Sequence, residues 1–279
     1  MLMNQLVIRL REKLIRYLSR PIFVTDDIKI GKGTVIGKNV RFACKKIVIG
    51  DGVQIGDGVV FECTTLAIGD FATIYPGCFF PGPGDLTIGH NFWLGSNSII
   101  DSQGGTIIGN NVGIGAHSHL WTHMKYGDVA AECRFHSQHP IVVEDDAWLV
   151  GHVLVSPVRI SARSVVLLGS LVVNDIPPDR VYAGTPAKDV TDKFGPQFQN
   201  NTFEERRAFV ARRIEQIATS AGIREIWSRI TLVDKYAHSE TSNELVINLS
   251  ERTYLKQGTD FERFIIRALL PDAKFIPMS

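Results

Sequence analysis

Aliphatic residues recur every six positions over most of the chain, each followed by glycine or another small residue. Five pairs are each six residues apart: Ile30/Ile36, Ile49/Ile55, Ile68/Ile74, Leu94/Ile100 and Ile108/Ile114. Successive groups step by 19, 19, 20 and 20 residues, at Ile30, Ile49, Ile68, Ile88 and Ile108. After residue 140 the register resumes with a step of 17, at Val143, Leu149 and Val155, then Ile160, Val166 and Val172. The chain therefore repeats as units of three hexapeptides with one or two extra residues at a corner.

This period strongly limits the possible folds. A six-residue unit is too short to fold alone, but it can form one flat face of a three-sided parallel β-helix, with each aliphatic side chain stacked on its equivalent one coil away. Glycine suits the corners, and the β-branched residues and glycines of the repeat disfavour an α-helix. Cys44 and Cys63 are one 19-residue step apart, so we expect them to stack as small hydrophobic residues and not to form a metal-binding pair.

Two segments flank the repeat. Residues 1–20, "MLMNQLVIRLREKLIRYLSR", predict a basic amphipathic helix that ends before Pro21. We expect its apolar face to pack on the protein, with contact to a membrane surface as the alternative. The β-helix is predicted over residues 21–195, because prolines and a glycine stop strand pairing near residues 172–190. Residues 196–279 predict a small α+β domain, opened by a capping box of Thr202 and Glu205.

Composition narrows the classes of function and compartment. The formal net charge is +1 with 21% charged residues, which provides no concentrated basic surface for nucleic acid. No apolar run approaches the roughly 18 to 20 residues that would span a bilayer. The four cysteines form no CxxC pair, and the sequence shows no cleavable signal. We therefore expect a cytoplasmic protein with reduced cysteines.

The closing segment "AWLVGHVLVSPVRISARSVVLLGSLVVNDIPPDRVYAGTPAKDV" carries a resemblance. With the hexapeptide register, its "DIPP" turn and "AGTPAK" segment resemble the hexapeptide-repeat acyltransferases over residues 28–190, about three fifths of the chain. The resemblance implies a left-handed β-helix, whereas crossover rules alone favour a right-handed one. It also implies a homotrimer with acyl-CoA between subunits. The expected activity is acetyl transfer from acetyl-CoA to a hydroxyl of a sugar or glycan precursor, as in polysaccharide biosynthesis.

The segment "HSHLWTHMKYGD" contains three histidines where the register lapses. Leu120 is the next inward position after Ile114. Residues 121–141 are predicted to form a loop that extends away from the β-helix. By resemblance to the family's sugar O-acetyltransferases, His123 is the general base, which removes the hydroxyl proton without a covalent intermediate. His117 and His119 are alternates within the helix wall. Asp128 is ranked first as the carboxylate partner of the base, ahead of Glu132, Glu144 and Asp145.

Further residues are assigned to acetyl-CoA by the same resemblance. Those expected near the pantetheine arm are Trp148, Gly151, Leu168 and Gly169. Arg180 and Lys188 are candidate phosphate contacts. Asn174 stands where many relatives have a lysine that holds CoA phosphates, and Val150 and Ser161 replace usual glycines. These departures put the geometry of the CoA site in question.

Two other classes of function compete with acyl transfer. One branch of the left-handed β-helix proteins comprises zinc carbonic anhydrases with three histidine ligands. His117 and His119 point to the same side of a strand, and a third ligand could come from His123, His136, His139 or His152. Their spacing does not match that branch, so no metal is expected. The other class is a non-catalytic β-helix scaffold.

Overall fold

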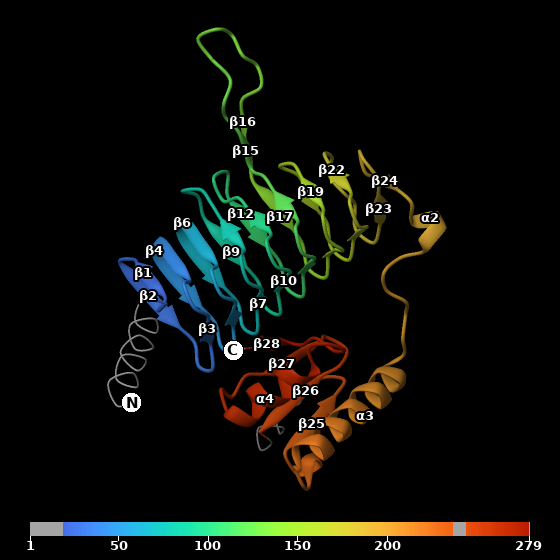
Figure 1. The fold of residues 1–279 in the computed structure, drawn as a ribbon. Coiled ribbons are helices and arrows are strands. Elements are labelled where there is room, and N and C mark those ends of the chain that lie inside the picture. Colours follow the sequence, from blue (N-terminus) through green and yellow to red (C-terminus); the bar gives the residue numbers. More distant parts are fainter. Residues whose placement is uncertain (1–18, 237–243, 279) are drawn as a thin grey trace, which may run out of the picture.

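The computed structural model describes residues 19–236 and 244–278, and its centre is a three-sided parallel β-helix. The predicted helix over residues 1–20 lies, up to residue 18, outside the described residues. Within the described residues, no helix has the length and apolarity needed to cross a membrane. In chain order, each coil contributes a strand to a first, a second and a third face (Figure 1).

The first face consists of β2 (Asp27–Ile30), the C-terminal halves of β4 (Arg41–Ile49) and β6 (Val60–Ile68), β9 (Leu86–Ile88), β12 (Thr106–Ile108), β17 (Ile141–Val143) and β20 (Arg159–Ile160). The third face consists of β1 (Ile22–Val24), the N-terminal halves of β4 and β6, β8 (Phe79–Phe80), β11 (Ile99–Ile100), β14 (His119–Leu120), β19 (Leu154–Val155) and β22 (Leu171–Val172). Because β4 and β6 run around the corner, they join these two faces into one 13-stranded sheet.

The second face is a separate 9-stranded sheet. Its strands are β3 (Val35–Ile36), β5 (Gln54–Ile55), β7 (Thr73–Ile74), β10 (Trp93–Leu94), β13 (Gly113–Ile114), β18 (Trp148–Leu149), β21 (Val165–Val166), β23 (Val181–Ala183) and β24 (Lys188–Asp189). All pair in parallel except β23 with β24, which pair antiparallel. The parallel coil architecture predicted from the hexapeptide period is thereby confirmed, and its left hand stays a prediction from the resemblance.

The predicted inward positions form the core. Ile100, Leu120 and Val155 stack as register partners on successive coils and are at most 2% exposed. Cys44 and Cys63 are register partners with their Sγ atoms 2.9 Å apart, as predicted, and the rings of Phe42, Phe61 and Phe80 stack beside them at centroid distances of 4.9 and 4.5 Å. Ile30, at 43% exposure, and the partly buried Ile36 are the exceptions, because the first coil has no further described coil below it.

Glycine is required at the corners where coils approach most closely. A Cβ atom built on Gly69 would lie 2.6 Å from the carbonyl carbon of Gly89, and one on Gly89 would lie 2.6 Å from that of Gly109. Both distances are far below van der Waals contact with backbone that cannot move aside. The small residue after each aliphatic position thus follows from the spacing between coils.

After the short helix α2 (Thr191–Phe194), the remaining chain forms a C-terminal unit with its own apolar core. Helix α3 (Phe203–Ala221) has the predicted capping box of Thr202 and Glu205 and ends at the left-handed Gly222. The rest consists of η1 (Ile226–Ser228), α4 (Asp260–Leu269) and a four-stranded sheet of β25 (Ile230–Val233), β26 (Leu245–Asn248), β27 (Thr253–Leu255) and β28 (Ile276–Met278). Strand β25 was not expected from the sequence.

Charged contacts hold the C-terminal unit on the β-helix beside the second face (Figure 1). Lys256 Nζ lies 2.6 Å from Asp70 Oδ2 and 2.9 Å from Asp51 Oδ2. Both terminal nitrogens of Arg252 donate to the Asp146 carboxylate at 2.8 Å. Bidentate and half-buried pairs of this kind define orientation better than exposed pairs do.

Strand β12 offers a matched test of the core. Ile108 is 1% exposed and points into the coil, whereas Ile107 is 52% exposed on the same strand. Ile108→Ala should lower the free energy of unfolding by about 2 to 5 kcal/mol, because it removes buried methylenes and leaves a cavity. Ile107→Ala should change it by roughly 0.5 kcal/mol or less. Urea unfolding followed by circular dichroism measures both, and equal effects would contradict the assigned register.

Candidate active site

The β-helix is interrupted by one long excursion at the corner between the third and first faces. The excursion leaves after β14 and returns at β17, with Ile141 paired to Thr106, so residues 121–140 lie outside the three faces. Its base is a two-stranded antiparallel ribbon of β15 (His123–Met124) and β16 (Ser137–Gln138). Figure 1 shows the loop extending away from the coils on the side opposite the C-terminal unit.

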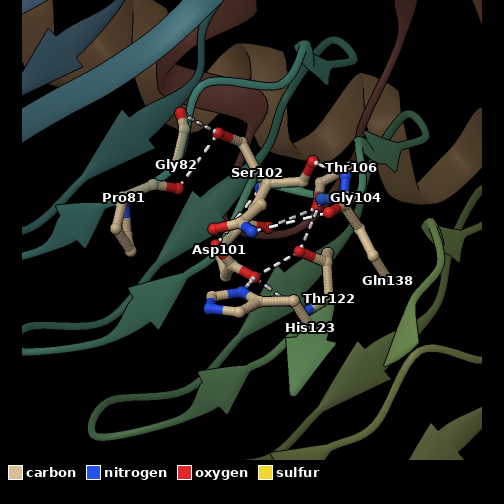
Figure 2. A network of polar contacts seen from close by, with 10 residues as sticks. Pro81, Gly82, Asp101, Ser102, Gly104, Thr106, Thr122, His123 and Gln138 are labelled. Atoms are coloured by element: carbon tan, nitrogen blue, oxygen red, sulfur yellow. Dashed lines mark hydrogen bonds and ion pairs between the residues drawn. The ribbon is translucent and has the colours of Figure 1, made fainter. Parts of the chain in front are cut away.

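His123 lies at the base of this loop and is paired with a buried carboxylate. Its Nδ1 is 2.7 Å from Asp101 Oδ2 (Figure 2). The Asp101 side chain is 0% exposed and that of His123 is 26% exposed. Asp101 follows β11 on the preceding coil, where its backbone N–H donates to Leu120 O at 2.9 Å. One coil therefore supplies the carboxylate and the next supplies the imidazole.

Several donors hold the Asp101 carboxylate in place. The backbone N–H of Thr122 donates to Oδ2 at 2.9 Å, and the Thr122 hydroxyl donates to the same oxygen. The backbone N–H of Gln103 donates to Oδ1 at 3.2 Å. The Thr122 hydroxyl in turn accepts from Gly104 N–H at 2.9 Å (Figure 2). This network fixes both oxygens of a carboxylate that no solvent reaches.

The pKa of Asp101 reflects two opposing effects. Burial raises it, but the hydrogen bonds from Thr122 and His123, together with the backbone donors, outweigh burial and leave the pKa below its usual value. Asp101 is therefore ionised at neutral pH. Because an ionised carboxylate can only accept, the proton of a neutral His123 lies on Nδ1 and the Nε2 lone pair is available to take a proton.

The structure does not bring Asp128 to His123. Asp128 is exposed in the outer part of the loop, where its Oδ1 accepts from Ala131 N–H at 3.2 Å within a local turn. Glu144 pairs with Arg159, and Asp145 accepts from Asn110 N–H at 2.7 Å. Asp101 was not among the predicted partners, all of which lie close to His123 in the chain. The 20-residue step from Leu120 back to Ile100 was the signal that could have found it.

The other two histidines of the segment have different surroundings. His119 is half-buried on β14, and its ring meets the edge of Trp121 at a centroid distance of 6.3 Å. The His117 ring stacks on His152 at 5.0 Å. Among residues 19–236 and 244–278, no three His, Cys, Asp or Glu side chains form a group that could hold a metal ion. The described structure thus gives the zinc alternative no ligand set.

Three of the residues predicted to contact CoA, Gly151, Leu168 and Gly169, lie at a different corner from His123. Gly151 and Gly169 meet on adjoining coils at the corner between the second and third faces, where Gly169 N–H donates to Gly151 O at 3.1 Å. Leu168 is 65% exposed beside them. The remaining candidates are exposed: Trp148 on the second face, Asn174 after β22, Arg180 opposite Asp189, and Lys188 on β24. The structure therefore does not bring Gly151, Leu168 or Gly169 to His123 within one chain, whereas Asn174 lies at the same corner as His123, two coils further on.

Comparison with known proteins identifies acetyltransferases as relatives. The chain is 30% identical over 122 residues to the galactoside O-acetyltransferase of Escherichia coli (strain K12), which covers 43% of this chain and 60% of that protein. It is 33% identical over 106 residues to the putative acetyltransferase YJL218W of Saccharomyces cerevisiae, which covers 37% and 54%. The chain thus matches only a little over half the length of these relatives. No protein-family model matches it.

Solved structures of similar architecture include AntD, an N-acyltransferase from Bacillus cereus in complex with dTDP-4-amino-4,6-dideoxyglucose and coenzyme A. The TM-score is 0.44 at 14% identity, over 72% of this chain and 96% of that one. The relatives in sequence thus include a galactoside O-acetyltransferase and a putative acetyltransferase.

The lowered pKa of Asp101 predicts a pH dependence of stability. Because the pKa is lower in the folded than in the unfolded chain, the stabilisation by ionised Asp101 is complete above the unfolded value of about 3.9. It is lost as the pH falls through the folded value. The excess free energy of unfolding of wild type over Asp101→Asn should therefore shrink as the pH falls below about 4. Urea unfolding at each pH measures this difference, and an excess that grows as the pH falls below about 4 would contradict the assignment.

Proposed function

We propose that this chain, whose relatives are acetyltransferases, transfers an acetyl group from acetyl-CoA to a hydroxyl of a sugar or glycan precursor, with His123 as general base. The observation that carries the proposal is the contact of His123 Nδ1 with the buried Asp101 carboxylate, 2.7 Å away at the base of the loop. The sugar acceptor is supported by the relative that is a galactoside O-acetyltransferase.

The proposed reaction needs one base and no covalent enzyme intermediate. His123 Nε2 accepts the proton of the acceptor hydroxyl while its oxygen attacks the thioester carbonyl. The C–O bond forms, the tetrahedral intermediate collapses, and the C–S bond breaks. The leaving CoA thiolate then takes the proton from the imidazolium. Asp101 stabilises the imidazolium and holds the ring in the Nδ1–H tautomer, so it acts as a positioning residue.

The donor site is proposed to form between copies of the chain in a homotrimer. His123 lies at the corner between the third and first faces, whereas Gly151, Leu168 and Gly169 lie at the corner between the second and third faces. A neighbouring copy that places its corner between the second and third faces beside His123 would complete the site. In this arrangement Trp148 lies near the pantetheine arm, Arg180 and Lys188 contact the CoA phosphates, and Asn174 replaces a further cation.

The remaining parts of the proposal concern the chain as a whole. Residues 21–195 form the catalytic domain, and residues 196–279 form an accessory α+β domain. The protein is proposed to act in the cytoplasm.

His123→Ala tests the base. Acetyl-CoA turnover, followed by release of free thiol with galactosides and other sugars as acceptors, should fall about 10²-fold or more, the scale of general-base catalysis. His136→Ala is the matched control, because His136 belongs to the same loop but is exposed. Activity should survive a chelator. If chelation abolishes activity, or if both histidine variants behave alike, the proposed mechanism fails.

Asp101→Asn and Asp128→Asn separate the two carboxylates. Asp101→Asn should lower kcat about 10-fold or more with a small change in KM for acetyl-CoA. The reason is that an amide no longer holds the proton of His123 on Nδ1. Asp128→Asn should leave kcat within about twofold. Circular dichroism checks that both variants fold. A larger fall in kcat for Asp128→Asn than for Asp101→Asn would instead assign the positioning role to Asp128.

A further inference from the structure

A large cavity in the described part of the chain is lined by residues that do not include His123. It has a volume of about 1470 Å³ and separates the second face of the β-helix from helix α3, the segment before it, and the end of the C-terminal unit. His123 lies at the corner between the other two faces. This groove is therefore separate from His123. Its wall includes Trp148, which is proposed above to lie near the pantetheine arm of CoA, but its other lining residues have been assigned no function so far.

Aromatic rings line both walls of the groove. Tyr75, Trp93 and Trp148 project from the second face and are 42%, 41% and 48% exposed. Phe198 and Phe209 face them from the segment before α3 and from α3 itself, at 44% and 39% exposure. Such large rings left open to solvent within a concave site provide flat apolar surfaces for a ligand.

A gap separates the two tryptophans. Trp93 and Trp148 are both register partners of Gly113, which lies on the strand between them. Since neighbouring strands are about 4.8 Å apart, the two indole side chains start roughly 9.6 Å apart with no side chain between them. A Cβ atom at Gly113 would lie 3.3 Å from Trp148 Cδ1. Any side chain here would therefore fill the gap.

Two buried carbonyl oxygens in the groove lack a hydrogen-bond donor. Asn91 is 4% exposed, and its Nδ2 donates to Asn111 Oδ1 at 2.9 Å and Phe275 O at 3.0 Å. Because both partners are acceptors, the amide orientation is fixed and Oδ1 is the atom left without a partner. Gln197 donates to Asp146 O, and its Oε1 is likewise buried and unpartnered. Both residues line the groove and call for a ligand that donates hydrogen bonds.

We propose that this groove binds a glycan chain, with sugar rings on Trp93 and Trp148 and sugar hydroxyls donating to Asn91 and Gln197. A pyranose ring offers an apolar face to an aromatic ring and hydroxyl donors at its edge. A phosphate group only accepts and would leave both amide oxygens unsatisfied. The proposal goes beyond the acetyl transfer reaction, because the groove binds glycans whether or not His123 catalyses transfer.

The experiment measures binding of the full chain to an array of neutral and acidic oligosaccharides, with calorimetry on those bound. Wild type should bind at least one glycan. Trp93→Ala should weaken binding about tenfold or more by removing a stacking surface, and Gly113→Val should weaken it by filling the gap. Trp227→Ala is the matched control, since Trp227 is also 41% exposed but does not line the groove, and it should bind like wild type. His123→Ala should retain binding as well.

Four results would overturn the proposal. They are no glycan bound by wild type at millimolar concentration, binding unaffected by Trp93→Ala and Gly113→Val, binding abolished by His123→Ala, and displacement of the glycan by acetyl-CoA alone. The third would assign the glycan to the catalytic site, and the fourth would assign the groove to CoA. A failure of acetyl transfer with binding intact would count only against the proposed function.

Discussion

The stacking of each coil on the one below it determines where every functional residue lies. Parallel backbone hydrogen bonds and the columns of inward aliphatic residues allow only one register, because a slip of one residue would turn the whole core outward. Leu120 must therefore lie on Ile100. Asp101, the residue after Ile100, then lies directly beneath the point where the loop leaves the coil. The carboxylate of the site thus belongs to the coils, although the imidazole belongs to a loop.

This arrangement suits a base that must stay in one tautomer. A carboxylate in solvent would exchange partners freely, whereas Asp101 is fully buried and held by Thr122 and Gln103 from two different coils. Its ionisation is maintained by these hydrogen bonds against the effect of burial. The β-helix separates the corner that carries the loop from the second face. Lys256 and Arg252 anchor the C-terminal unit beside that face. The proposed catalytic histidine and the proposed glycan groove therefore lie on different sides of the β-helix.

Much of the fold follows from spacing, because a hexapeptide period leaves few alternatives. The inward positions, the loop and the stacked pair of Cys44 and Cys63 could all be predicted in this way. Asp101 could not be found by proximity along the chain, since it lies 22 residues before His123 and meets it only across coils. The docking of the C-terminal unit on the β-helix could not be predicted from the sequence either. Its charged contacts, such as Lys256 with Asp70, join residues 186 positions apart and follow no period.

The central claim is that Asp101 fixes His123 with its proton on Nδ1 and its Nε2 lone pair free. Nitrogen-15 NMR of protein labelled at histidine, at a pH where His123 is neutral, reports directly which ring nitrogen carries the proton. The account predicts the Nδ1–H tautomer for His123 in wild type and a mixture of tautomers in Asp101→Asn, with His136 unchanged. A dominant Nε2–H tautomer in wild type, or a tautomer that Asp101→Asn does not alter, would contradict it.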